Sequence, residues 1–292
     1  MPQTATTGNL ASAQRIVIEQ ARFTAEHNAP MLSLVEHFRL GKGEKSIVVP
    51  KVGQFTASAV GDGVDIADEQ DIGMTTTTLT TSEVGMKIIL TDKLVRQLNE
   101  DTFRMVGRQA GDAMARKKDG DILALFSALN GGTDLGSAGR DMELGNVSIL
   151  IGWALANKLP KPWAIVHNPW AVMNLTASFF GYAGGTPGTG AGAALASDYS
   201  QELLKDFFSV NVGGVPIFHD GNLTLDASND AIGAIFSKNA MCYAESVEYN
   251  QETERDASLR ATELVWSSDY GVFELDDSYG APVTFNCVNA TA

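Results

Sequence analysis

The chain has 292 residues, with 35 acidic and 21 basic side chains and a formal net charge of −14. Hydrophobic residues make up 44% and aromatic residues 8%, which is typical of a folded globular protein and argues against wholesale disorder. The sequence has neither a run of 18 apolar residues nor a leader in which basic residues precede an apolar segment. We therefore expect no membrane span and no classical secretion signal. The acidic net charge argues against a dedicated nucleic-acid binder.

Two short amphipathic helices are expected in the first forty residues. Ser12 can cap the first of them, and apolar side chains follow it at helical spacing through Phe23. Pro30 suits the first turn of the second helix, which apolar residues continue to Phe38. The glycines at 41 and 43 then end the helical pattern.

A long two-stranded ribbon is predicted next. Residues 46–60 have the composition of a β-strand, and threonine-rich and β-branched residues over 74–90 predict the returning strand. The connection at 61–73 carries five acidic side chains and no basic one: Asp62, Asp65, Asp68, Glu69 and Asp71. Because an isolated hairpin is marginally stable in water, we expect the ribbon to lie on a partner's surface.

One long helix is predicted over residues 92–129, where apolar side chains keep helical spacing. Charged side chains stand four residues apart along another face of this helix: Arg96, Glu100, Arg104, Arg108, Asp112 and Arg116. Such a ladder is typical of a solvated helix face. Its alternative role is contact with a partner.

From residue 141 onward, helices and strands alternate. Trp163 to Val166 is predicted to be a short buried strand. Tyr243, Val247 and Tyr249 are predicted to share one face of a later strand. Helices are predicted over 146–158, 169–180 and 198–209, a strand-turn-strand unit over 210–223, and further strands over 231–249 and 258–285.

No motif in the sequence predicts catalysis. The loop from Gly184 to Gly192 has the glycines of a phosphate-binding loop, but Ala191 and Gly192 stand where that loop needs a lysine and a Ser or Thr. The acidic tip lacks the alternating oxygen ligands of an EF-hand. A solvated tip that faces a partner is therefore the favoured interpretation, with an irregular calcium site as the alternative.

The histidines and cysteines have structural interpretations. The four histidines show neither HExxH nor zinc-ligand spacing. His167, in the segment AIVHNPW, is expected to be a satisfied, partly buried residue at a strand-to-helix turn. Cys242 and Cys287 are expected to be buried, reduced thiols. We therefore predict no enzyme activity, no cofactor and no metal, and the features that remain are interaction features.

The order of these parts resembles the major capsid protein of tailed bacteriophages, which has the α+β Hong Kong 97-type fold. The resemblance covers nearly the whole chain. It is clearest in AMCYAESVEYNQETERDASLRATELVWSSDYGVFELDDSYGAPVTFN, where a strand pair runs through an Arg-containing turn into a paired final strand. It implies an N-terminal arm (1–43), an extended loop (44–83), a peripheral domain (84–140) with the spine helix (92–129), an axial domain (141–240) and closing peripheral strands (241–292).

The resemblance implies a structural subunit that assembles itself into hexamers and pentamers. These form an icosahedral head around double-stranded DNA, in the virion, after assembly in the host cytoplasm. Ser12 already caps the first predicted helix, which leaves no room for the cleaved scaffolding region of some family members. A separate scaffolding protein is therefore implied, together with a portal, and a cement protein is a further candidate partner.

The residues expected at subunit contacts are the tip acids (Asp62, Asp65, Asp68, Glu69 and Asp71) and the helix arginines (Arg96, Arg104, Arg108 and Arg116). The nearest alternative function is that of an encapsulin-like compartment shell. Such shells share the fold, but they have a shorter loop and an N-terminal helix in place of a free arm.

Overall fold

We analysed a computed structural model of the chain, which describes residues 30–41, 44–52, 55, 57, 59, 62, 73–93, 100–179 and 210–288. The first predicted arm helix, most of the predicted ribbon tip, the glycine-rich loop and the predicted helix 198–209 lie outside these residues.

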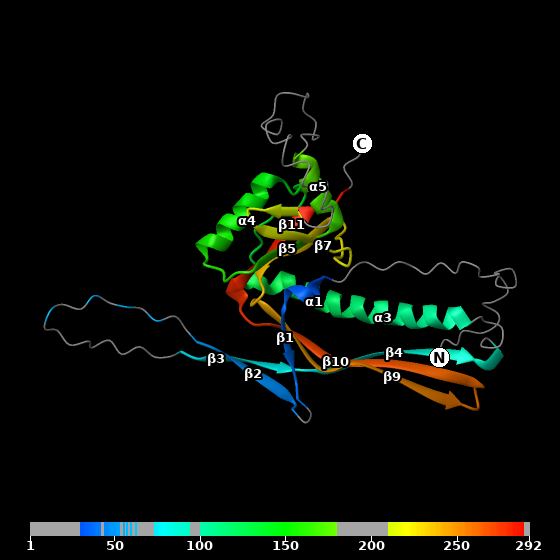
Figure 1. Ribbon diagram of the computed structural model, residues 1–292. Coiled ribbons are helices and arrows are strands. Elements are labelled where there is room, and N and C mark those ends of the chain that lie inside the picture. The colour runs from blue at the N-terminus through cyan, green and yellow to red at the C-terminus, as the bar shows by residue number, and fades with distance from the viewer. Residues whose placement is uncertain are drawn as a thin grey trace.

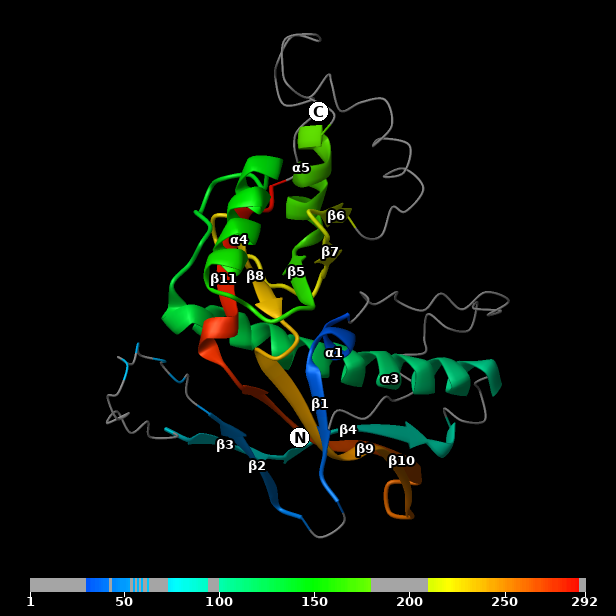
Figure 2. The same cartoon turned by 60° about the vertical axis from the view of Figure 1, so that its left-hand side comes forward.

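The described chain forms two stacked parts with a projecting ribbon (Figures 1 and 2). In the lower part, the long helix α3 (Glu100–Leu123) lies along a four-stranded sheet. In the upper part, a five-stranded sheet carries helices α4 (Leu144–Ala156) and α5 (Pro169–Phe179). The ribbon projects on the far side of the arm from α3 (Figure 1).

The lower sheet joins strands from distant parts of the chain. Its strand order is β1-β9-β10-β4, with β1 parallel to β9 and the other neighbours antiparallel. The strands are β1 (Glu36–Arg39), β9 (Met241–Asp256), β10 (Ala261–Glu274) and β4 (Ser82–Thr91).

The upper sheet has the buried strand β5 at its centre, in the order β11-β8-β5-β7-β6. All five residues of β5 are buried, which confirms the predicted core strand with Trp163, Ile165 and Val166. The strands are β5 (Trp163–His167), β6 (Val210–Val212), β7 (Val215–His219), β8 (Asp230–Ser237) and β11 (Gly280–Asn286). The predicted helices of this part are confirmed as α4 and α5, and the strand-turn-strand unit as β6 and β7.

The long helix ends earlier than predicted. After Leu123 the chain tightens into the 3-10 segment η3 (Ala124–Gly132), and Asn130 adopts a left-handed conformation with φ 54°. The apolar pattern continues because Phe126 in the tighter turns and Leu129 at the kink that follows them are both buried in the core. A continuous helix through residue 129 was therefore wrong, although the same side chains face the core.

The arm also differs from its prediction. Helix α1 is a single turn, Met31–Leu34, after which the chain extends into β1. The prediction of a helix through Phe38 was wrong because the apolar residues of this segment are buried by pairing with β9, whose Tyr243 lies opposite His37. Periodicity within the arm carries no signal of that distant strand.

The alternating face predicted for β9 is also broken. Tyr243 is buried, whereas Val247 and Tyr249 are each nearly half exposed. Two register shifts between β9 and β10, on either side of Asp269, insert extra residues into β9. A single extra residue moves the following side chains to the opposite face, so the three residues do not share one face.

Candidate assembly surfaces

The predicted ribbon is present over six residue pairs. Strands β2 (Ser46–Lys51) and β3 (Thr75–Thr80) run antiparallel, with Ser46 opposite Thr80 and Lys51 opposite Thr75. Of the five acidic tip residues, the structure describes only Asp62, which is exposed. Asp65, Asp68, Glu69 and Asp71 lie outside the described residues.

The root of the ribbon is held by its own subunit. Leu79 on β3 is fully buried, and Ile47 and Val49 on β2 pack into the same apolar cluster. That cluster also contains Leu40 from the arm and Cys242 from β9. The expectation that the whole ribbon needs a partner's surface was therefore wrong for its root.

An ion pair fixes the outer end of β2. The Lys51 ammonium lies 2.6 Å from the Asp276 carboxylate and 5.9 Å from the centre of the Tyr279 ring. Burial alone raises the pKa of Asp276, but hydrogen bonds from Lys51 and Ser278 outweigh it, so this pKa lies below its ordinary value. The ribbon thereby contacts the turn between β10 and β11.

The returning strand divides at Thr81. Residues up to Thr80 pair with β2, whereas Ser82 begins β4, which pairs with β10. The Thr81 hydroxyl donates a hydrogen bond of 3.0 Å to Asp269 at this division. The prediction that 74–90 forms one leg of the ribbon was therefore wrong beyond residue 80, because its second half belongs to the lower sheet.

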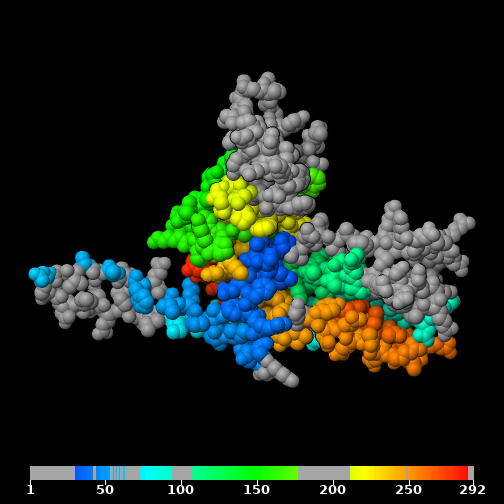
Figure 3. Space-filling model, in the orientation of Figure 1, coloured from blue at the N-terminus to red at the C-terminus, as the bar shows by residue number. Residues whose placement is uncertain are grey.

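The ribbon carries several exposed apolar side chains. Figure 3 shows the described residues of β2 and β3 beside the arm residues, at the edge of the body of the subunit. More than half of the surface of each of four apolar side chains is exposed there: Val48, Val52, Phe55 and Met74. Apolar side chains gathered on a projecting element are typical of a contact surface.

The helix arginines form no single cluster with the acidic tip in the described chain. Arg108 and Arg116 are exposed on α3. Arg96 lies outside the described residues, and only the backbone of Arg104 is described. The strands β2 and β3 lie on the opposite side of β1 from α3 (Figures 1 and 2).

His167 and the two cysteines occupy buried positions. His167 is fully buried rather than partly buried; its Nε2 lies 3.1 Å from the Val283 carbonyl oxygen, and its Nδ1 accepts from the Asn168 amide. Burial lowers the pKa of His167 to about 4, so the ring is neutral near pH 7. Cys242 and Cys287 are free and buried, as predicted, and burial raises their pKa values to about 12 and about 11.

Within the described ranges, no three His, Cys, Asp or Glu side chains converge as a metal ion would require. The helices among these residues are too short or too polar to cross a membrane.

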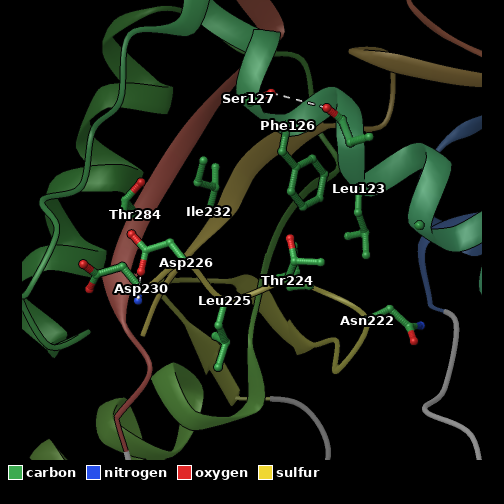
Figure 4. A pocket seen from close by; sticks show the side chains of 13 residues that line it. Leu123, Phe126, Ser127, Asn222, Thr224, Leu225, Asp226, Asp230, Ile232 and Thr284 are labelled. Atoms are coloured by element: carbon green, nitrogen blue, oxygen red, sulfur yellow. Dashed lines mark hydrogen bonds between the residues drawn. The ribbon is translucent and has the colours of Figure 1, made fainter. Parts of the chain in front are cut away.

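An open cleft of about 630 Å³ separates the end of the long helix from the upper sheet (Figure 4). Phe126 lines it on one side, and Leu225 and Ile232 line it on the other, each of the latter pair 43% exposed. Its carboxylates have structural partners: Asp226 accepts the amides of Ser228 and Asp230, and Asp230 accepts the amide of Gly139. Sequence reasoning missed this cleft, because distant segments form it and no local pattern signals it.

No protein-family model and no curated protein matches the chain. Solved structures do match. The acidic stable capsid of Helicobacter pylori bacteriophage KHP30 is 11% identical, with a TM-score of 0.69 and coverage of 99% of each chain.

A cyanophage Pam1 capsid chain is 12% identical, with a TM-score of 0.68, covering 95% of this chain and 97% of that chain. A Mycobacterium phage Che8 chain is 14% identical, with a TM-score of 0.67, covering 90% of this chain and 94% of that chain. The chain therefore has the mixed α+β fold of these phage capsid chains, and the predicted resemblance is confirmed at the level of the fold.

Proposed function

We propose that this chain is the major capsid protein of a tailed bacteriophage, a structural subunit and not an enzyme. The observation that carries this proposal is the full-length match to phage capsid and head structures, which leaves no large part of either chain unaccounted for. The subunits assemble into hexamers and pentamers of an icosahedral head that encloses double-stranded DNA in the virion. Assembly takes place in the host cytoplasm with a separate scaffolding protein and a portal, and a cement protein is a further candidate partner.

The predicted parts take corresponding roles in this proposal. Residues 1–43 are the arm, 44–83 the extended loop, 84–140 the peripheral domain with its spine helix, 141–240 the axial domain and 241–292 the closing strands. The four-stranded lower sheet under α3 and the five-stranded upper sheet with α4 and α5 support a division into two domains.

The ribbon is the element that reaches a neighbouring subunit. The buried Leu79 holds its root and the Lys51–Asp276 ion pair holds the outer end of β2, so the direction of these two strands is set within the subunit. Its exposed apolar side chains are then available to a second copy. The acidic tip meets basic groups of that neighbour, for which the exposed Arg108 and Arg116 on α3 are candidates.

The net charge agrees with a container for DNA. A chain with a net charge of −14 lines a shell that repels phosphate groups instead of binding them tightly. DNA is thus enclosed without being recognised by sequence.

An encapsulin-like compartment shell, the alternative with the same fold, is not favoured. The matching structures named above are phage capsids. The projecting ribbon also agrees better with the longer loop of the viral proteins.

Electron microscopy and sedimentation velocity of the purified full chain test this function. The chain should form capsomers or closed shells, alone or with a scaffolding protein, because the exposed apolar side chains of the ribbon need a neighbour. Encapsulated enzyme in place of DNA would support the compartment instead. A compact monomer under every salt condition, with scaffold present, contradicts both.

A further inference from the structure

A buried carboxylate joins the arm to the long helix and to the upper sheet. Asp119 on α3 is fully buried, and its Oδ1 accepts a hydrogen bond of 3.1 Å from the backbone amide of Met31, the first residue of α1. Its Oδ2 accepts a hydrogen bond of 3.0 Å from the side chain of Asn222, in the loop after β7. Figure 3 shows the blue arm residues against the green of α3. Asp119 is therefore the polar centre of a three-way junction.

A second buried carboxyl group completes this junction. Asp220 is fully buried, and its Oδ1 accepts the Asn222 amide at 2.8 Å. Its Oδ2 has no hydrogen-bond donor among the described residues, and the neighbouring side chain is that of Asp119. Two ionised carboxylates side by side repel each other, and a buried acceptor without a donor is destabilising. A proton on Asp220 removes both penalties, because the protonated oxygen then donates to Asp119.

The other charged and titratable groups near the junction have contacts of their own. Lys118 on α3 directs its ammonium over the rings of Tyr243 and Tyr270, 5.5 and 5.4 Å from their centres. Asp121, two residues after Asp119 on α3, accepts the Tyr270 hydroxyl and pairs with Lys117. On β5, His167 accepts the Asp220 amide through its backbone oxygen, and its ring is neutral near pH 7.

Two more titratable groups lie on the chain near the junction. His219 immediately precedes Asp220 on β7, and His37 of β1 has its ring at the Leu32 carbonyl oxygen. Burial, followed by the hydrogen bond and charge of Asp119, raises the pKa of Asp220 against the opposing hydrogen bonds from Asn222, and the net result is a pKa of about 8.

We propose that Asp119 and Asp220 share one proton, and that this proton holds helix α1 of the arm against α3. Release of the arm admits water to the pair, and the proton then leaves Asp220. Docking of the arm therefore takes up a proton. Docking is strongest in acid and weakens as the pH rises from the ordinary pKa of an aspartate to about 8. Above about pH 8 it no longer depends on pH. The inference rests on the subunit fold and does not depend on the proposed function.

Hydrogen exchange of the peptide that contains Met31 measures the docking directly, because its amide is the group that Asp119 binds. After correction for the intrinsic exchange rate, protection should fall by up to about tenfold per pH unit, hence up to about 100-fold between pH 6 and 8. Asp220→Asn keeps the shape and supplies an N–H donor, so its protection should stay high and change little with pH. Glu83→Gln, at an exposed carboxylate of β4, is the matched control and should behave as the wild type.

Infrared difference spectra give a second measurement, in which the band is first observed in the unmodified protein and then assigned with a variant. A protonated-carboxyl band should persist at pH 6 and disappear by pH 9, and Asp220→Asn should lack it. The proposal is overturned if wild type and Asp220→Asn show the same pH dependence of protection, or if no such band is present at pH 6.

Discussion

Ile165 occupies the centre of the upper core. It is fully buried in β5, where its backbone lies between Ile217 of β7 and Ile235 of β8. Replacing Ile165 with Ala should lower the free energy of unfolding by about 2–5 kcal/mol, because the neighbouring strands cannot close the cavity that remains. Guanidinium denaturation measures the effect.

Ile149→Ala is the matched control for this prediction. Ile149 lies on α4 with 67% of its surface exposed, so its replacement should change stability by less than about 0.5 kcal/mol. Equal denaturation midpoints for the two variants would contradict the position of β5 in the core.

The root of the ribbon depends on a glycine of β10. A Cβ on Gly271 would stand 2.3 Å from the Thr80 carbonyl oxygen, at the residue where β3 ends. Gly271→Ala should therefore destabilise the subunit by about 1–3 kcal/mol, because backbone has to move. Thermal unfolding measures this, and proteolysis within the ribbon should become faster in the variant.

A helical glycine gives the opposite expectation. A Cβ on Gly107 of α3 would meet no atom within 4 Å. Gly107→Ala should stabilise the protein by about 0.5–1 kcal/mol, because alanine loses less backbone entropy in a helix. If both alanine variants melt alike, the close approach of β10 to Thr80 is wrong.

Elements with a local signal were predictable from the sequence. The apolar run of β5, the periodic helices α4 and α5 and the two-glycine turn between β6 and β7 each carry their own pattern. Gly213 and Gly214 both have positive φ in that turn, which is why glycine occurs there.

Elements that depend on distant partners were not predictable. The arm becomes strand β1 because β9 lies beside it, and the returning strand divides at Thr81 because β10 offers a longer partner than β2. The Asp119–Asp220 pair and the cleft beside Phe126 arise in the same way, from residues about a hundred positions apart.

At the scale of the whole molecule, the ribbon tip should be dispensable for folding and essential for assembly. Replacing residues 56–73 with Asn-Gly keeps every pair from Ser46–Thr80 to Lys51–Thr75, together with the root. The melting temperature of the subunit should be unchanged, and closed shells should be lost. Calorimetry and electron microscopy measure the two outcomes.

A charge variant distinguishes the effect of the tip's length on assembly from the effect of its acidic side chains. Conversion of Asp62, Asp65, Asp68, Glu69 and Asp71 to the corresponding amides keeps the length of the ribbon. It should weaken assembly most at low salt, since each exposed ion pair contributes about 0–1 kcal/mol but recurs at every junction. Normal particles from the shortened protein would show that the ribbon is not the element that reaches the neighbour.

The strand order of the lower sheet has a consequence for synthesis on the ribosome. The first strand of this sheet, β1, pairs with β9, the root of the ribbon packs against Gly271, and the outer end of β2 pairs with Asp276. The partner residues in all three contacts are translated late. Pairing between strands that are distant in sequence is slow to form. During synthesis, β1 and the ribbon strands are made before the strands that they contact. A nascent chain that stops before Asp276 therefore lacks the carboxylate that pairs with Lys51 at the outer end of β2. We therefore expect prematurely terminated products to lack an anchored ribbon.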